Sequence, residues 1–346
     1  MPRAVIGHQL GAPESYVLEE HDPGRPGSGE ARVAIRAAGV SYVDVLTAMG
    51  EYQVKPPVPF IPGSEFAGVI EAVGQGVTGL APGDRVYGSS FGKLFAESAV
   101  LDARNLGRIP DGVSFATAAT FPVSYQTAFH ALVDRARIQP GEALLVLGAA
   151  GATGHAAVQL GKHLGARVIA SASSGEKQAA AAAAGADAVV TTGAEDWREQ
   201  VKAANGGQPI DVVFDPVGGS ATEPALRSLG YGGRHLLIGF PAGPTAIRTN
   251  LVLIKSVELI GVQLRHFAVE RPEQAHANSR KVSELVAQGV ILPAIARTYP
   301  LEDYAAAMRH AFSGKSAGRI VLTMGRGDEP PRCEQAVRAE SAAKNA

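Results

Sequence analysis

The residues with the clearest chemical role form a glycine-rich turn, Ala149-x-Gly151-x-x-Gly154, near the middle of the chain. A short apolar run, Ala143–Leu147, precedes it, and residues 155–165 follow with apolar side chains at helical spacing. A strand, a glycine turn and a helix in this order predict a phosphate-binding site. Backbone N–H groups at the helix N-terminus attract anions there, and small residues let a pyrophosphate approach. We assign the turn residues to cofactor binding: Gly151, Ala152, Thr153 and Gly154.

The next predicted strand, Ala166–Ser171, indicates which nicotinamide cofactor fits. An NAD site usually has an acidic residue at the end of this strand, but here the sequence SASS follows the strand's apolar part, with Lys177 just beyond. A carboxylate would repel a 2′-phosphate, whereas the hydroxyl of Ser173 can donate to it and Lys177 can neutralise it. Alternatively, Ser173 caps the helix over residues 174–184 and Lys177 is a solvated surface charge. We predict the phosphate site, and therefore NADPH rather than NADH.

These motifs need a doubly wound parallel sheet to position them. Residues 124–265 alternate predicted strands and helices, which is typical of a Rossmann α/β domain. Residues 1–123 are β-rich, with apolar runs separated by Pro-Gly pairs, and residues 266–325 are expected to complete this first domain with helices and a last strand. The polar, aperiodic residues 326–346 predict a disordered tail.

One strand of the parallel sheet also predicts self-association. Residues Val257–Leu264 are apolar on both faces and come last in this sheet by chain order. A long apolar edge tends to associate unless it is covered, so we expect it to pair with a second copy in a homodimer. Coverage of the edge by its own chain is the alternative.

Composition narrows the class of protein. With 346 residues the chain is long enough for two domains, and 32 Lys and Arg against 33 Asp and Glu give a net charge of −1. This balance favours neither nucleic acid nor an anionic membrane as a partner. The single cysteine, Cys333, excludes an intrachain disulfide. With neither a signal-peptide core nor an apolar run of about 18 residues, the sequence predicts a cytoplasmic protein.

Four stretches of the chain carry a family resemblance. They are residues 37–52 (AAGVSYVDVLTAMGEY), residues 59–88, the nucleotide turn together with SSGEK, and FDPVGG at 214–219. Together they resemble the medium-chain dehydrogenase/reductase superfamily, and within it the zinc-independent NADPH:quinone oxidoreductase branch, over residues 1 to about 325. The resemblance implies an α/β protein in which a GroES-like catalytic domain, residues 1–123 and 266–325, accompanies the Rossmann domain.

The same resemblance implies an activity. It is reduction of a small-molecule substrate by NADPH, with hydride transfer to a quinone or another electron-poor α,β-unsaturated carbonyl. One alternative is an enoyl-thioester reductase, which has the same fold. Another is a cofactor-binding protein with little catalysis, like the lens crystallin or RNA-binding members of the family.

The resemblance further predicts that no metal is bound. Zinc alcohol dehydrogenases carry a cysteine where Ser41 stands here and a histidine where Ser64 stands. A catalytic zinc needs three protein ligands, and Glu65 alone does not make such a site. Without a Lewis acid, the site suits an acceptor that is already electron-poor.

Further cofactor-binding residues follow from the resemblance alone. It places Thr127 near the nicotinamide, and it places Gly239 and Phe240 at the carboxyl edge of the sheet, where cofactor and substrate meet. Asn250 begins a segment that resembles a cofactor-covering segment of the family. The alternatives are that Thr127 bonds its own helix backbone and that Phe240 is a core residue. Quinone reductases often have a tyrosine beside the phosphate at the position of Thr192.

Two residues are candidates for the chemistry itself. The resemblance places Tyr52 near the open face of the nicotinamide, where a phenol can donate a hydrogen bond to an oxyanion or a proton to a carbanion. Ser41 replaces an asparagine common in quinone reductases, and Leu46 replaces a tyrosine found in some of them. The alternative for Tyr52 is a half-buried aromatic in a proline-rich loop, and Asp44 is expected to be structural.

Overall fold

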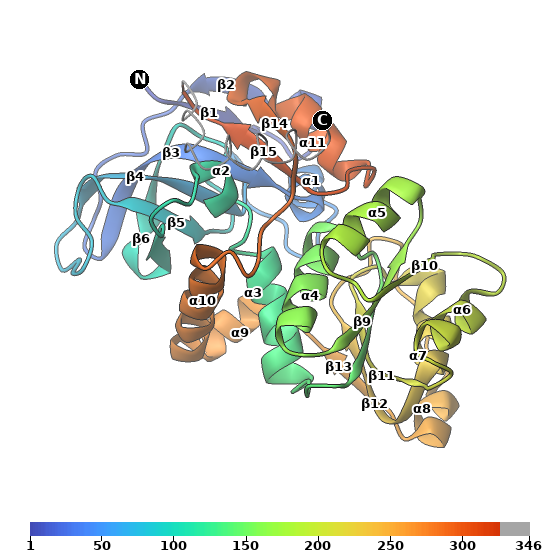
Figure 1. The fold of residues 1–346 in the computed structure, drawn as a ribbon. Helices are drawn as coiled ribbons and strands as arrows, with labels where there is room; N and C mark the ends of the chain where they lie inside the picture. The colour runs from blue at the N-terminus through green and yellow to red at the C-terminus, as the bar shows by residue number, and fades with distance from the viewer. Residues whose placement is uncertain (326–346) are drawn as a thin grey trace, which may run out of the picture. The chain divides into compact units, whose positions relative to one another are not determined.

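The computed structural model describes residues 1–325, and the chain divides into two compact units. Of the described residues, the first unit comprises Met1–Val123 and residues 294–325, and the second comprises Ser124–Pro293 (Figure 1). Residues 266–293 therefore belong to the second unit, although we expected the first domain to resume at 266. The predicted tail, residues 326–346, and Cys333 lie outside the described residues.

Contacts with Asp134 and His130 explain why this segment joins the second unit. The segment contains most of α9 (Leu264–Glu270) and all of α10 (Pro272–Ala287), which follow the parallel sheet in the chain. From α10, Asn278 Nδ2 donates to Asp134 Oδ2 at 2.7 Å and Gln274 Nε2 donates to Asp134 Oδ1 at 2.9 Å. From α9, the Phe267 ring stacks on His130 with ring centroids 3.8 Å apart. These polar contacts could not be predicted from the sequence, because they join residues far apart in the chain.

The first unit is built on a mainly antiparallel sheet with the strand order β14-β15-β3-β4-β5-β7, to which β6 adds by pairing with β3. Among the strands within residues 1–325, this sheet has one parallel pair, β14 with β15. Its elements are β1 (Arg3–Ile6), β2 (Val17–Glu20), β3 (Glu30–Val40), α1 (Tyr42–Met49), β4 (Glu65–Val73), β5 (Arg85–Ser89), β6 (Ser98–Asp102), β7 (Leu106–Arg108), α2 (Phe115–Ala118), β14 (Ile295–Pro300), α11 (Tyr304–Phe312) and β15 (Arg319–Thr323).

Strand β3 organises this unit. Its first residues alternate between buried and half-buried positions, as expected for a strand with one face on the core. Buried side chains of β3 pack with those of β4 and β15, among them Ile35, Phe66 and Leu322. The strand thereby brings residues of the first hundred positions beside those of the last strand.

The second unit holds a six-stranded sheet in which all strand pairs are parallel. The strand order is β10-β9-β8-β11-β12-β13. Besides α9 and α10, the helices and strands of this unit are α3 (Ser124–Phe129), a π-helical turn (His130–Arg135), β8 (Ala143–Val146), α4 (Ala152–His163), β9 (Arg167–Ala172), α5 (Gly175–Ala183), β10 (Ala188–Thr191), α6 (Trp197–Ala204), β11 (Ile210–Asp215), α7 (Thr222–Ser228), β12 (Leu229–Leu237), α8 (Thr249–Lys255) and β13 (Glu258–Gly261). The predicted fold class, a β-rich domain with a doubly wound parallel sheet, is confirmed.

The strand order defines one special position at the sheet's carboxyl edge. From β8 the chain builds β9 and β10 on one side, then returns to build β11, β12 and β13 on the other. The crevice between the carboxyl ends of β8 and β11 is therefore the topological switch point, where open parallel sheets bind ligands.

The edge strand β13 is shorter than predicted. It spans four residues, and Leu264, predicted to end the strand, begins α9. Ile260 is buried, whereas Leu259 is 37% exposed, so the strand buries its apolar side chains on one face only. The strand lies at the sheet edge with β12 as its neighbour, in agreement with its place in the chain. Within residues 1–325, no helix is both long and apolar enough to cross a membrane.

Candidate functional site

The glycine turn leads directly from β8 into α4. The helix begins at Ala152, earlier than the predicted start at His155. Gly151 is the N-cap residue, and its own N–H donates to the carbonyl of Gly148 at 2.9 Å. The first bond inside the helix runs from His155 N to Gly151 O at 2.7 Å. The N–H groups of residues 152–154 precede this first helical donor and have no acceptor inside the helix, and the capping glycine has no side chain to satisfy them. This is the arrangement that binds a phosphate.

Gly154 is required by a close backbone approach. A Cβ atom at this position would lie 2.2 Å from the carbonyl oxygen of Gly148, well inside van der Waals contact. The turn therefore folds back onto the first turn of α4. On its other side, the turn meets the loop after β11, because a Cβ at Gly148 would lie 2.8 Å from Val217 Cγ2. The turn and this loop form the two walls of the switch point.

A polar residue near the end of β9 pairs with one that follows β10. Ser171 is fully buried, and its hydroxyl lies 2.7 Å from Thr192 Oγ1. The Ser171 hydroxyl also accepts a hydrogen bond from Trp197 Nε1 at 3.0 Å. Thr192, at the position of the family's tyrosine, is therefore tied to the sheet.

The first turn of α5 carries the predicted 2′-phosphate residues. Ser174, not Ser173, is the N-cap, since its Oγ accepts from Lys177 N at 3.4 Å. The alternative in which Ser173 caps this helix is thus wrong. Ser173 is exposed, and its hydroxyl makes no hydrogen bond within residues 1–325. Lys177 is half-buried one turn into the helix. Because β8 and β9 are parallel neighbours, Ser173 lies at the same sheet edge as the glycine turn.

The structure distributes the remaining cofactor candidates unevenly. Gly239 follows β12 at the carboxyl edge, where its N–H and that of Ile238 donate to Asp215 O. Phe240 is 51% exposed, so the alternative that it is a core residue is wrong. Thr127 is half-buried on α3, and within the described chain its hydroxyl makes no hydrogen bond to the helix backbone.

Asn250 lies away from this group. It is exposed on the first turn of α8, and the end of α8 is anchored at the amino edge of the sheet, where Lys255 Nζ donates to the carbonyl of Leu229 at 2.5 Å. Figure 1 places α8 at the end of the second unit opposite α5. The structure thus gives Asn250 no contact with the glycine turn.

In the first unit, Ser41 and Asp44 form a capping box at the start of α1. The Ser41 hydroxyl donates to Asp44 Oδ2 at 2.6 Å and accepts from Asp44 N at 3.1 Å, while Ser41 N donates to Asp44 Oδ2 at 2.8 Å. Burial raises the pKa of Asp44, against the hydrogen bonds from Ser41 and Ser64, which lower it. Ser41, a predicted catalytic residue, thus has its hydroxyl engaged in holding α1, and Asp44 is structural as expected.

A buried ion pair lies beside this box. Arg319, the first residue of β15, pairs with Glu65, the first residue of β4, and both side chains are less than 10% exposed. They meet across Gly39 of β3, where a Cβ would lie 2.8 Å from Arg319 Nη2 and 2.8 Å from Glu65 Cγ. Glu65 Oε2 also accepts from Val123 N at 3.0 Å. Burial lowers the pKa of Arg319 to about 10, so the guanidinium remains charged at neutral pH.

These contacts do not fit a zinc site. Ser41 and Ser64 both direct their hydroxyls to Asp44, and Glu65 is neutralised by Arg319. Nowhere in residues 1–325 do three or more His, Cys, Asp or Glu side chains gather as metal ligands would. A hydroxyl is also a poor substitute for the thiolate and imidazole ligands that zinc prefers.

Tyr52 lies at the other end of α1 from Ser41. Its N–H donates to Leu46 O at 3.2 Å, just after the helix C-cap Gly50, and its side chain is half-buried. Its phenol makes no hydrogen bond within the described residues. Because α1 has eight residues at 1.5 Å per residue, about 12 Å of helix separates the two predicted catalytic residues. Tyr52 is therefore the better placed of the two to act on a ligand.

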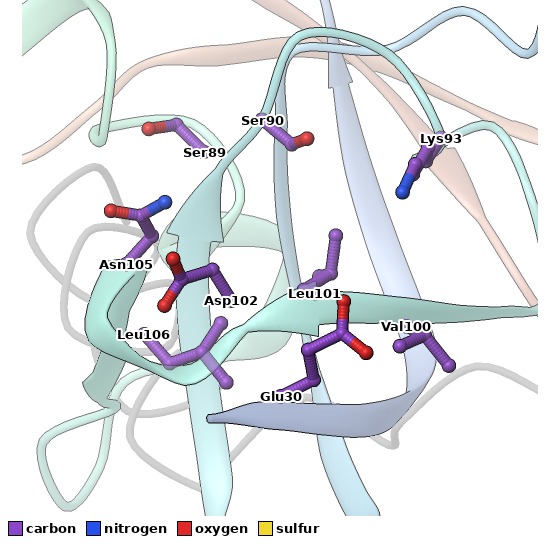
Figure 2. Close-up of a pocket in the computed structure, with 9 residues that line it drawn as sticks. All are labelled: Glu30, Ser89, Ser90, Lys93, Val100, Leu101, Asp102, Asn105 and Leu106. Carbon is purple, nitrogen blue, oxygen red and sulfur yellow. The ribbon is translucent and has the colours of Figure 1, made fainter. Parts of the chain in front are cut away.

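Two cavities have linings that include no residue of the glycine turn. One, of about 220 Å³, is in the first unit, and Figure 2 shows Glu30, Lys93 and Asp102 around it. Its two carboxylates already accept hydrogen bonds from Gly27 N and Arg104. The other, of about 330 Å³, lies at the carboxyl end of β10, and Thr192 and Trp197 line it. Neither contains a predicted site residue.

The structure also shows contacts at the sheet's carboxyl edge that the sequence did not reveal. Asp215 appears in the FDPVGG stretch, but its partners Thr222 and His235 gave no signal in the sequence. Both contact the Asp215 carboxylate at the end of β11. Only the parallel pairing of β11 with β12 brings His235 to this point.

Comparisons with known proteins agree with this architecture. Residues 27–125 match the alcohol dehydrogenase GroES-like domain, and residues 152–280 match the zinc-binding dehydrogenase family. Quinone oxidoreductase-like protein 2 of Mus musculus is 37% identical over 329 residues, which cover 93% of this chain and 92% of the relative.

Two solved structures have the same fold over nearly the whole chain. A mycobacterial protein solved in complex with NADPH has a TM-score of 0.85 and 29% identity, covering 93% of this chain and all of that one. The CurK enoyl reductase has a TM-score of 0.86 and 25% identity, covering 94% of this chain and 99% of that one. The chain therefore belongs to the medium-chain dehydrogenase/reductase family, as an oxidoreductase of its quinone oxidoreductase-like group.

Proposed function

We propose that the protein is a zinc-independent, NADPH-dependent reductase that transfers a hydride to a quinone or another electron-poor α,β-unsaturated carbonyl. The observation that carries this proposal is the start of α4, where the N–H groups of residues 152–154 have no helical acceptor at the switch point of the sheet. The similarity to a mycobacterial protein that binds NADPH supports a nicotinamide cofactor.

The residues present fit NADPH better than NADH. The N–H groups at the start of α4 would hold the pyrophosphate. Ser173, exposed and not used as the helix cap, would donate to the 2′-phosphate, and Lys177 would neutralise it. The strand end carries no carboxylate for a ribose 2′-hydroxyl. When bound, the cofactor supplies the hydride.

Zinc independence rests on the donor set. Because Ser41, Ser64 and Glu65 are all engaged by other protein groups, we infer that the substrate carbonyl is not polarised by a metal. Hydrogen bonding by the protein, with Tyr52 as the candidate donor, would stabilise the charge that develops on the acceptor.

An enoyl-thioester reductase is the second candidate function. The similarity to the CurK enoyl reductase favours it, since that enzyme shares the fold over nearly the whole chain. In this reaction a carbon atom must be protonated after hydride transfer, so Tyr52 would have to donate a proton rather than a hydrogen bond. A protein that binds the cofactor with little catalysis is a third reading.

One screen separates these readings. The purified protein is mixed with NADPH and, in parallel assays, with a simple quinone, an enone or an enoyl-thioester. The absorbance of NADPH is followed in each assay, before and after the protein is treated with a chelator. We expect turnover with the quinone, unchanged activity after chelation, and no stoichiometric zinc by elemental analysis. Turnover confined to the enoyl-thioester would establish the second candidate, absence of all turnover would favour the third, and one tightly held zinc per chain would refute zinc independence.

We also propose a homodimer formed through the edge of β13 that has no strand partner within residues 1–325. This edge strand pairs with β12 on one side, and its Leu259 is 37% exposed. Pairing of two copies would satisfy the open backbone groups of both edges. We expect light scattering to give a dimer mass at micromolar concentration, and a monomer mass would contradict this. A cytoplasmic location remains a prediction from the sequence.

A further inference from the structure

Asp215 fixes the loop that faces the glycine turn. It is the last residue of β11 and is 1% exposed. Its Oδ1 accepts hydrogen bonds from Val217 N at 2.9 Å and from Gly218 N at 2.8 Å. Its Oδ2 accepts from Thr222 Oγ1 at 2.8 Å, and His235 Nε2 lies 3.1 Å away. Four donors thus surround one carboxylate.

The loop held in this way forms one wall of the switch point. Val217 packs against the glycine turn, at the position where Gly148 leaves room for it. Gly218 adopts a positive φ of 71° and lies against Phe240, which would be 2.8 Å from a Cβ at this position. A shift of the Asp215 carboxylate would therefore move both the wall beside the glycine turn and the segment that carries Phe240.

His235 is an unusual residue for its place in the sheet. It lies on β12, flanked by β11 on one side and the edge strand β13 on the other, and is fully buried. Since Asp215 is acceptor-only when ionised, His235 donates from Nε2, which leaves Nδ1 without a partner among the described residues. A buried nitrogen without a partner is costly and calls for a compensating gain.

The compensation lies in the state of Asp215. Burial would raise the pKa of this carboxyl, but the hydrogen bonds from His235 and from Gly218 N lower it below its ordinary value. The carboxylate therefore stays charged and can accept from both backbone N–H groups of the loop. A protonated Asp215 would carry an O–H donor on one oxygen, so it would accept fewer hydrogen bonds and lose part of its hold on the loop.

We propose that His235 is a positioning residue for the cofactor site, which holds the Asp215 carboxylate and thereby the loop of residues 216–219 against the glycine turn. This inference rests on the proposed binding of NADPH at that turn. His235 acts through Asp215 and takes no part in hydride transfer, so its loss weakens cofactor binding without changing the choice between NADPH and NADH.

Two substitutions at this position test the proposal. His235→Leu removes the donor and keeps an apolar side chain in the sheet, whereas His235→Gln offers an amide N–H that reaches about as far as the imidazole Nε2. NADPH affinity is measured directly, by the change in NADPH fluorescence on titration with protein, alongside kcat and KM with a quinone. We expect His235→Leu to raise the Kd and KM for NADPH about tenfold with kcat changed less than twofold, and His235→Gln to restore affinity to within about threefold of the wild type, which are the effects of one charge-assisted hydrogen bond and its replacement.

A second His–Asp pair in the same unit provides the matched control. His130 is also buried, and its Nδ1 lies 2.8 Å from Asp134. This pair contacts α9 through His130 and α10 through Asp134, and not the loop at the sheet's carboxyl edge. We expect His130→Leu to lower the melting temperature by a comparable amount while leaving the Kd for NADPH unchanged.

The outcomes separate this inference from the proposed function. If the wild type does not bind NADPH, the proposed function fails. If the wild type binds NADPH and His235→Leu binds it equally well, the positioning role is refuted while the function stands. Equal loss of affinity in His235→Leu and His130→Leu would also refute it, because the effect would then follow from stability alone.

Discussion

The carboxyl edge of the parallel sheet and the polar cluster around Gly39 use polar groups in opposite ways. At the sheet edge, the start of α4 presents backbone N–H groups for which the protein supplies no helical acceptor. In the first unit, Ser41, Asp44, Glu65 and Arg319 bear the more reactive side chains, yet each is bonded to another protein group.

This difference teaches how a ligand site is distinguished from a structural cluster. Binding requires groups that the protein leaves unsatisfied and accessible, and the glycine turn meets this requirement with almost no functional side chains. The cluster around Gly39 includes positions where zinc enzymes of the family place ligands. Here the Ser41 hydroxyl is hydrogen-bonded to Asp44, and Glu65 is paired with Arg319. We therefore expect substitutions at the sheet edge to affect ligands, and substitutions in the cluster to affect stability.

The largest expected effect is on stability, at Arg319. Arg319→Met would leave the Glu65 carboxylate buried without its cation, and breaking such a buried pair costs about 3–5 kcal/mol of unfolding free energy. Chemical denaturation of the purified protein measures this loss. We expect NADPH affinity of the folded fraction to stay within about twofold of the wild type, since additivity holds for sites without shared partners.

A double variant checks the physical reason. Arg319→Met with Glu65→Gln removes the buried charge as well, so part of the lost stability should return. If Arg319→Met instead abolished cofactor binding at unchanged stability, the cluster would belong to the ligand site and the comparison would be broken.

The next effect is on cofactor binding, at Gly154. Gly154→Val places a side chain 2.2 Å from the carbonyl oxygen of Gly148, so the turn must move away from the start of α4. A displacement of about 1 Å at a positioned site can cost about 100-fold, and we expect at least this loss of NADPH affinity by fluorescence titration.

The control for this variant is Gly261→Ala in β13, where an added Cβ has nothing within 4 Å. It should bind NADPH as the wild type does. Full affinity in Gly154→Val would show that the cofactor does not depend on the close approach of turn and helix.

A smaller effect, on cofactor preference, is expected at Lys177. Lys177→Ala should raise the KM for NADPH and leave the KM for NADH nearly unchanged. The loss of binding free energy for NADPH should be about 1–2 kcal/mol, the value of a charge-assisted contact. Lys202→Ala, in the last turn of α6, removes an exposed charge elsewhere in the unit and serves as the control. Equal losses for both cofactors, or a wild type that prefers NADH, would refute the 2′-phosphate assignment.

The two regions also differ in how far the sequence could predict them. The glycine turn, the strand before it and the parallel sheet follow from local patterns of glycine and apolar residues, and the structure confirms this fold. The Asp44 contacts could have been anticipated in part, because Ser41-x-x-Asp44 has the spacing of a capping box.

Other features depend on contacts between distant residues, which a single sequence does not reveal. The pair of Glu65 with Arg319 spans most of the chain, and the pair of Asp215 with His235 depends on strand order. The same reason explains the domain boundary. Residues 266–293 join the second unit through Asp134 and His130, which are polar residues without a recognisable local pattern. Thr127 and Tyr52 keep the roles that the family resemblance suggests as predictions.

The smallest expected effect tests whether any side chain in the first unit acts on the substrate. Tyr52 is half-buried, and its phenol makes no hydrogen bond within residues 1–325, so it differs from the closed cluster at the other end of α1. If the acceptor is a quinone, its oxygens take the charge after hydride transfer and water can protonate them. Tyr52→Phe should then lower kcat with a quinone only about threefold, as for one neutral hydrogen bond.

An enoyl-thioester would give a different result, because a carbon atom must then be protonated. A positioned acid typically contributes about 10²–10⁴-fold to such a step, so the same variant should lose at least 100-fold in kcat with an enoyl-thioester. Tyr231→Phe, at a side chain that is 91% exposed in the second unit, is the matched control and should be neutral with both substrates. A 100-fold defect of Tyr52→Phe with a quinone would mean that proton donation limits quinone reduction as well. The first unit would then contain an open catalytic group as important as the glycine turn, and the contrast between the two regions would have to be abandoned.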